Sequence, residues 1–173
     1  DPLDAYFQAE PLLTFSPSVP ILRPGVRQAL LAPQIPHRSA AFTVLAQRVE
    51  AQLGDLMGWP EAAVAVVAGS GTLANELMVG ALTQRPGRCL VLSGGEFGQR
   101  LARQASAHDA DLEVLDFGWG RPIDVERVEQ TLAADPTIGQ LLFVAVETCC
   151  GRVNPIHPLL DVAARHGVRV GLD

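Results

Sequence analysis

The sequence contains no lysine, and all 13 of its basic residues are arginine. Because 19 residues are acidic, the net charge is −6 and no basic stripe is present, which argues against nucleic acid as the main partner. Charged residues make up only 18% of the chain and hydrophobic residues 48%. This composition excludes a disordered chain and favours a globular protein with a well-buried core.

Cysteine is also scarce, with three residues, Cys89, Cys149 and Cys150. An odd number does not suit a disulfide framework and fits a reducing, cytoplasmic location better. No apolar run approaches the roughly 20 residues of a membrane span, and no signal-peptide pattern opens the chain. We therefore expect no membrane partner.

The chain begins with a proline-rich segment, and a pattern of alternating strands and helices follows it. Residues 1–24 contain five prolines and are expected to form an extended arm, whereas 25–173 are long enough for an α/β unit. Ser39 is the expected N-cap of a long amphipathic helix that ends at Gly58. Further helices are expected at 25–32, 72–82, 97–108, 124–134 and 158–166, and strands at 62–67, 88–92, 112–117, 140–146 and 168–172.

Five strands separated by helices predict a doubly wound, mostly parallel sheet between two layers of helices. Ligands of such sheets bind at the carboxyl ends of the strands. Residues that follow the predicted strands therefore deserve first consideration as site residues. They are Gly69–Thr72, Gly94–Phe97, Glu147–Cys150 and Asp173.

The G-S-G-T stretch, with Ser70, Gly71 and Thr72, leads from a predicted strand into a helix. Backbone N–H groups at the positive end of a helix dipole, together with two hydroxyls, can hold a phosphate. The stretch matches neither the P-loop nor the three-glycine dinucleotide pattern. A simple tight turn remains the alternative.

Three further strand-end residues suggest a flat, phosphorylated ligand. Phe97 offers an aromatic ring, although an isolated Phe more often belongs to the core. The Thr148 hydroxyl can reach the same rim or cap a turn. Asp173 ends an apolar run, where an acid needs a partner; a protonated ring nitrogen would serve, and an N-cap role is the alternative.

Together these parts resemble the N-terminal half of a class V aminotransferase, a fold type I family that uses pyridoxal phosphate (PLP). Within the family, the alanine–glyoxylate, serine–pyruvate and 2-aminoethylphosphonate–pyruvate transaminases are most similar. The resemblance rests on the order and spacing of six motifs: P-G-V-R-Q-A at 24–29, H-R-S-A-A-F at 37–42, G-S-G-T-L-A-N-E at 69–76, G-E-F-G-Q-R at 95–100, E-T-C-C-G-R-V-N-P-I at 147–156 and L-D at 172–173.

The resemblance implies that 25–173 form the N-terminal part of the PLP-binding large domain. Ser70, Gly71 and Thr72 would hold the cofactor phosphate, Phe97 would stack on its ring, and Thr148 would lie at its polar edge. Asp173 would act in catalysis by keeping the pyridine nitrogen protonated. A homodimer that transfers an amino group between a small amino acid, or an aminophosphonate, and a 2-oxo acid is implied as well.

Some residues depart from the family pattern. T-F-S-P at 14–17 replaces the usual T-P-G-P, and Cys149 and Cys150 stand where relatives have hydroxyl residues. We interpret the two cysteines as small-residue replacements, and Glu147 as a structural residue at a strand end. Arg38, next to His37, either approaches the active site or pairs with a carboxylate.

The missing lysine is the largest departure, since a PLP transaminase needs a lysine amine for the cofactor. In the family this lysine, like the substrate-binding arginine, lies downstream of the Asp173 position. We therefore expect a piece of a longer protein, inactive by itself. Three alternatives remain open: a PLP-dependent lyase or desulfurase, which usually has a histidine at the position of Phe97; a lysine-less, non-catalytic relative; and a nucleotide-binding module.

Overall fold

The computed structural model describes residues 22–173, which fall into two compact units that adjoin in sequence between Val66 and Val67. Most of the expected arm, including the T-F-S-P motif, lies outside the described residues. The division of the chain into an arm at 1–24 and a domain from 25 onward stays a prediction.

The first unit contains helices α2, Pro24–Leu30, and α3, Ala40–Leu56. The predicted cap of α3 is confirmed, because the Ser39 Oγ accepts a hydrogen bond from the Phe42 N–H at 3.2 Å. Gly58 follows the helix with a φ of 69°, a conformation that glycine adopts without the strain of a side chain.

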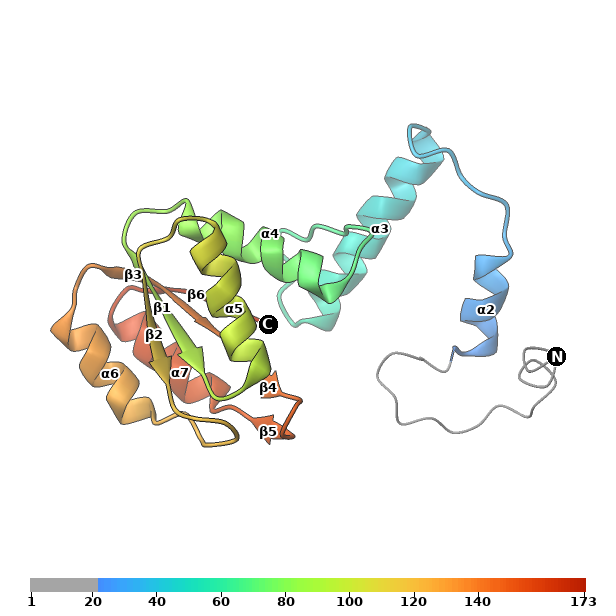
Figure 1. Ribbon diagram of the computed structural model, residues 1–173. Coiled ribbons are helices and arrows are strands. Elements are labelled where there is room, and N and C mark those ends of the chain that lie inside the picture. The colour runs from blue at the N-terminus through green and yellow to red at the C-terminus, as the bar shows by residue number, and fades with distance from the viewer. Residues whose placement is uncertain (1–21) are drawn as a thin grey trace. The chain divides into compact units, whose positions relative to one another are not determined.

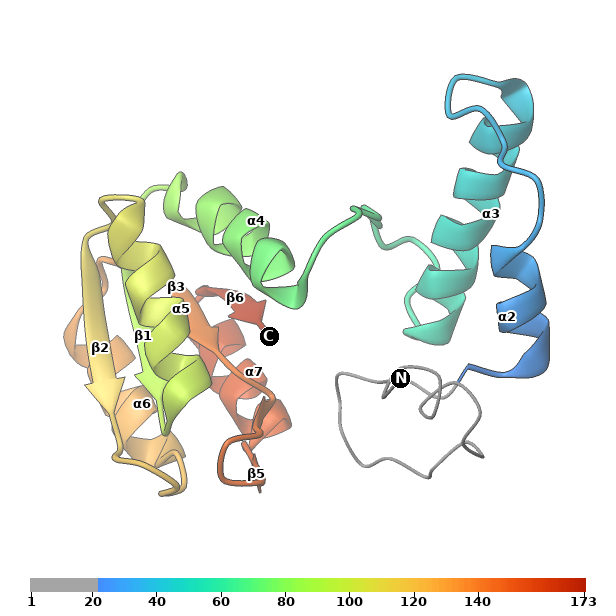
Figure 2. The same ribbon diagram turned by 45° about the vertical axis from the view of Figure 1, so that its right-hand side comes forward.

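The second unit is built around a four-stranded sheet with the order β2-β1-β3-β6, in which every pair is parallel (Figures 1 and 2). Its strands are β1, Arg88–Ser93; β2, Leu112–Asp116; β3, Ile138–Phe143; and β6, Arg169–Leu172. The helices are α4, Gly71–Thr83; α5, Glu96–Ala107; α6, Val125–Ala134; and α7, Ile156–Arg165. The α/β fold with a parallel sheet between helices is therefore confirmed.

The two faces of the sheet are covered by different helices. Helices α4 and α5 cover one face, and α6 and α7 the other. Alternate residues of a strand point to opposite faces, so both faces of the central strands must be apolar. Cys89, Val91, Leu142 and Val144 are buried with α4 and α5, and Leu90, Leu92, Leu141 and Phe143 with α6 and α7.

Helix ends in this unit follow local rules. Asp124 caps α6 as predicted, since its Oδ1 accepts hydrogen bonds from the N–H groups of Glu126 and Arg127 at 3.0 and 3.2 Å. Gly167, with a φ of 67°, follows the C-cap of α7. In the described residues no helix is long and apolar enough to cross a membrane.

The strand predicted at 62–67 is wrong, because the structure has no strand there. The run is apolar, but Val66 and Val67 are 64% and 54% exposed. A strand requires a hydrogen-bonded neighbour, and among the described residues no strand pairs with this segment. Apolar composition alone therefore led to the wrong element.

The strand predicted at 140–146 is divided. β3 ends at Phe143, and a short hairpin follows, formed by β4, Val146–Glu147, and β5, Arg152–Val153. Two-residue strands are too short to show an alternating pattern in the sequence. The hairpin lies beyond the carboxyl end of β3 and thereby supplies part of the rim of the sheet.

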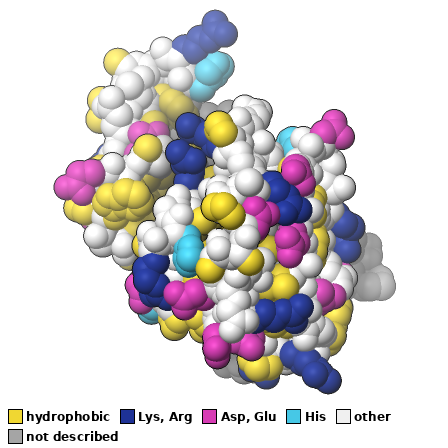
Figure 3. Space-filling model, turned by 90° about the vertical axis from the view of Figure 1, so that its left-hand side faces the viewer, with side chains coloured by type: hydrophobic (Ala, Val, Ile, Leu, Met, Phe, Trp, Pro, Cys, Tyr) yellow, Lys and Arg dark blue, Asp and Glu magenta, His cyan; other side chains and the backbone are white. Residues whose placement is uncertain are grey.

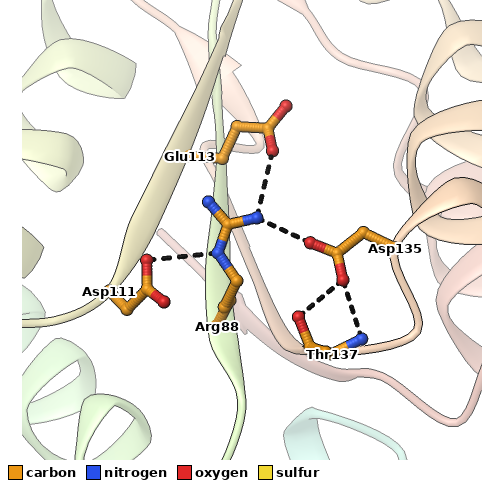
Figure 4. Close-up of polar contacts among 5 residues, drawn as sticks. All are labelled: Arg88, Asp111, Glu113, Asp135 and Thr137. Atoms are coloured by element: carbon orange, nitrogen blue, oxygen red, sulfur yellow. Dashed lines mark hydrogen bonds and ion pairs between the residues drawn. The ribbon is translucent and has the colours of Figure 1, made fainter.

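A cluster of charges joins the strands near their amino ends, opposite the rim. Arg88 Nη1 lies 2.6 Å from Asp135 Oδ2 and 3.6 Å from Glu113 Oε2, and Arg88 Nε lies 3.1 Å from Asp111 Oδ1 (Figure 4). Asp135 also accepts hydrogen bonds from Thr137. On the face that lies at the left in Figure 1, acidic and basic side chains are interspersed (Figure 3).

We expect Asp135→Asn to lower the Tm more than Asp111→Asn. Hydrogen bonds from Thr137 and then Arg88 hold the pKa of Asp135 below its usual value, whereas the Asp111 side chain is 72% exposed. A depressed pKa stabilises the folded state above the unfolded pKa of about 3.9, and this stabilisation is lost as the pH falls through the folded value.

Thermal unfolding of the wild type and both variants at pH 7 and pH 3 measures this effect. The difference between wild type and Asp135→Asn should shrink at pH 3. Equal losses of Tm for both variants at pH 7 would contradict the stabilising role of Asp135. A difference in Tm between wild type and Asp135→Asn that does not depend on pH would contradict it as well.

We expect Cys89 to resist alkylation in the folded protein. Burial raises the pKa of its thiol from 9.0 to about 11 and also blocks access, whereas Cys150 is exposed. Peptide mass spectrometry after treatment with iodoacetamide at pH 8 should find Cys150 modified first, and Cys89 only after denaturant is added. Modification of Cys89 as fast as Cys150 would show that β1 is not buried as described.

Candidate functional site

The order of the sheet reverses between β1 and β3, because β2 lies on one side of β1 and β3 on the other. At such a switch point the chain leaves the two neighbouring strands in opposite directions, and a crevice opens at their carboxyl ends. β1 continues through Gly94 and Gly95 into α5, and β3 continues into the β4–β5 hairpin. These two connections carry Phe97 and Thr148, two of the six predicted site residues.

Phe97 lies in the first turn of α5 and is half-buried. Its ring packs against the core beneath α4 and α5, and the guanidinium carbon of Arg100 lies 4.9 Å from the ring centroid. The cation–π contact follows from the spacing of three residues along the helix. The ring is thus held in place and is only partly accessible.

Glu147 lies opposite Phe97, on β4, and is 1% exposed. Its Oε1 accepts a hydrogen bond from the Phe97 N–H at 2.9 Å, and its Oε2 accepts one from the Gly98 N–H at 3.1 Å. The Cys149 thiol donates to Oε1 at 3.2 Å. The carboxylate therefore occupies the N-terminus of α5, where the helix dipole favours a negative charge.

Thr148 and Asp173 are both exposed on this rim. Thr148 directly follows Glu147, in the turn between β4 and β5. The backbone of Asp173 extends the pairing of β6 with β3, since its N–H donates to the Phe143 carbonyl at 3.1 Å and its carbonyl accepts from the Ala145 N–H at 2.7 Å. Both residues thus follow strands whose carboxyl ends form the rim.

The N-terminus of α4 carries the predicted phosphate-binding residues. Ser70 is its N-cap, with Oγ accepting from the Leu73 N–H at 3.3 Å. Gly71 and Thr72 are exposed, and the first N–H groups of a helix have no acceptor within it. A Cβ added to Gly71 would meet no atom within 4 Å. Within residues 22–173 the helix start thus has open space, and the Gly71 and Thr72 N–H groups have no hydrogen-bond acceptor, which fits a phosphate group.

The structure brings some of these residues together and leaves others apart. Phe97, Glu147, Thr148 and the backbone of Asp173 lie along the carboxyl ends of β1, β3 and β6. Within residues 22–173, no hydrogen bond joins Ser70, Gly71 or Thr72 to them. Instead, α4 is tied to α5 by Gln104, whose Nε2 donates to the Thr72 carbonyl at 3.2 Å.

Gln104 belongs to a polar contact between α4 and α5 that the sequence did not reveal. Its Nε2 also lies 3.0 Å from Glu76 Oε2, and His108 Nε2 lies 2.7 Å from Glu76 Oε1. His108 is the C-cap of α5. Glu76 was visible only as part of the G-S-G-T-L-A-N-E motif, because its partners are distant in sequence.

The two adjacent cysteines have different surroundings. Desolvation raises the pKa of the Cys149 thiol, and the nearby Glu147 carboxylate raises it further. Cys150 Sγ lies 3.4 Å from the Glu147 carbonyl oxygen. Cys149 thus remains a protonated donor near neutral pH, which agrees with a replacement for a hydroxyl residue. His37 and Arg38 are exposed in the turn before α3, and an active-site role for Arg38 stays a prediction.

Comparison with known proteins places this arrangement in a family. The chain matches the family model "Aminotransferase class-V" over residues 28–173. It is 36% identical over 105 residues to a 2-aminoethylphosphonate–pyruvate transaminase of Pseudomonas putida (61% of this chain, 28% of the relative). A second such transaminase, from Burkholderia lata, is 39% identical over 99 residues, which cover 57% of this chain and 26% of the relative. The aligned part of this chain thus spans little more than a quarter of these relatives.

Solved structures share the fold. An alanine–glyoxylate aminotransferase from Nostoc sp. superimposes with a TM-score of 0.82 at 24% identity, over 98% of this chain and 46% of its own. A Thermus thermophilus aspartate aminotransferase gives a TM-score of 0.78 at 28% identity, over 88% of this chain and 42% of its own. Since the family model covers most of the chain, the protein belongs to the class V aminotransferases.

Proposed function

We propose that the whole protein is a PLP-dependent aminotransferase. The observation that carries the proposal is the family match over residues 28–173, which includes every predicted site residue. The clustering of the Phe97, Thr148 and Asp173 positions at the switch point of the sheet supports it. The lysine that the chemistry requires is not among residues 1–173, so the proposal concerns a protein in which other residues supply it.

The residues would divide the work of binding. The free N–H groups of Gly71 and Thr72, with the Thr72 hydroxyl, would hold the phosphate at the start of α4. The Phe97 ring would limit the position of the pyridine ring, and the Thr148 hydroxyl would bind a polar group at its edge. Asp173 would accept a hydrogen bond from the protonated ring nitrogen and keep the proton there.

When it is bound, PLP supplies an electron sink for the charge that develops on the α-carbon of the substrate. The carboxylate of Asp173 makes this possible, because an ion pair stabilises the cationic ring. The named relatives favour 2-aminoethylphosphonate as the amino donor and pyruvate as the acceptor, with alanine and glyoxylate as the next pair to assay. Homodimer formation and a cytoplasmic location stay predictions.

The first experiment is borohydride reduction of the full-length protein, followed by intact-mass measurement. We expect one phosphopyridoxyl group per chain, attached to a lysine outside residues 1–173. A sample of the protein that has not been reduced should show pyruvate-dependent loss of 2-aminoethylphosphonate. A protein that has neither an adduct nor bound PLP would refute the proposal.

Asp173→Asn should lower kcat by at least about 100-fold, or about 2.7 kcal/mol of transition-state stabilisation, with a smaller effect on KM. The matched control is Asp116→Asn. Asp116 is also an exposed acid at the carboxyl end of a strand, but it lies on the edge strand β2 and accepts a hydrogen bond from the Gly118 N–H. Equal effects of the two substitutions in steady-state kinetics would argue against the role of Asp173.

A further inference from the structure

Glu147 is a buried acid that the proposed reaction does not use. Among the described residues no arginine or histidine forms an ion pair with it, although a buried carboxylate without partners is very costly. Its partners are the Phe97 and Gly98 N–H groups and the Cys149 thiol. Since both oxygens accept hydrogen bonds, the arrangement suits a charged carboxylate, which has acceptors only.

Glu147 replaces the cap that α5 lacks. The N-cap residue, Gly95, has no side chain to accept a hydrogen bond from the first turn. A Cβ at Gly95 would lie 2.6 Å from Glu147 Cγ and 2.9 Å from Cys149 Sγ. Glycine is therefore required at this position so that the carboxylate can approach, and the cap comes from a strand about 50 residues later in the sequence.

This contact spans the switch point of the sheet. It joins the connection after β1, which carries Phe97, to the connection after β3, which carries Thr148. We propose that Glu147 is a positioning residue: it fixes Phe97 and Thr148 relative to each other in the geometry that the cofactor ring requires. The inference rests on the proposed function, since it assigns Glu147 a role in the same site.

Cys149 also binds the Glu147 carboxylate, which anchors the start of α5. Its thiol is the third donor to the carboxylate and belongs to the same turn as Thr148. The Glu147 carboxylate thus links the Phe97 backbone to the Cys149 thiol. The exposed Thr148 lies between Glu147 and Cys149 in the sequence. Loss of this thiol removes one of three donors and leaves both backbone bonds intact, so its effect should be smaller than that of Glu147.

The test uses full-length apoprotein with Glu147→Gln and, as a matched control, Gln140→Met. Gln140 is also a fully buried polar residue. It lies near the amino end of β3, where its Nε2 donates to the Pro86 carbonyl at 2.8 Å. Three quantities are measured: the Tm, the hydrogen–deuterium exchange of the Phe97 and Gly98 amides, and the Kd for PLP.

Glu147→Gln should speed exchange of both amides and raise the Kd for PLP at least about tenfold, because an amide offers one acceptor where the carboxylate offers two. Gln140→Met should lower the Tm but change the Kd less than about twofold. Faster exchange with an unchanged Kd would mean that Glu147 is only a helix cap, and an equal rise in Kd for both variants would mean a general effect of instability. Either result would overturn the proposal.

If Glu147→Gln does not fold, the cysteine variants decide. Cys149→Ala should raise the Kd for PLP about threefold, Cys149→Ser should restore it, and Cys150→Ala should leave it unchanged. Identical Kd values for the three variants would overturn the proposal. Wild-type apoprotein that binds no PLP would refute the proposed function. In that case, provided Glu147→Gln folds, exchange of its Phe97 and Gly98 amides would still report whether the Glu147 carboxylate holds the start of α5.

Discussion

The pairing of β1 with two parallel neighbours is the constraint on which the second unit depends. β1 is apolar on both faces, and its backbone groups have no access to water, so they must bind β2 on one side and β3 on the other. Both faces then need helices to cover them. Since each fully buried leucine contributes roughly 2 kcal/mol, the alternating Leu90 and Leu92 on one face, and Val91 on the other, stabilise both layers together.

The same pairing sets the switch point of the sheet. With β2 and β3 on opposite sides of β1, the chain leaves β1 and β3 in different directions at their carboxyl ends, where sheets of this type bind ligands. Glu147 joins the connections that follow these two strands, because its carboxylate accepts hydrogen bonds from the N-terminus of α5. The Arg88 cluster joins the strands near their amino ends, at the other end of the sheet.

Local patterns predicted much of the fold. The caps Ser39 and Asp124 and the apolar strands β1 and β6 were found because their signals lie within a few residues. Where an apolar run depends on a distant partner, prediction was wrong or incomplete. Residues 62–67 have the composition of a buried strand but no neighbour among the described residues, and 140–146 includes the start of a hairpin too short to recognise.

The sequence by itself determined the fold class, the family and the strand-end positions of Phe97, Thr148 and Asp173, because periodicity and motif spacing are local properties. Only the tertiary structure decided which residues contact one another. Glu147 meets the Phe97 and Gly98 N–H groups across separations of 50 and 49 residues, and Arg88 meets Asp135 across 47. Such contacts form when the order and register of the strands bring distant segments side by side, and no local pattern specifies that order.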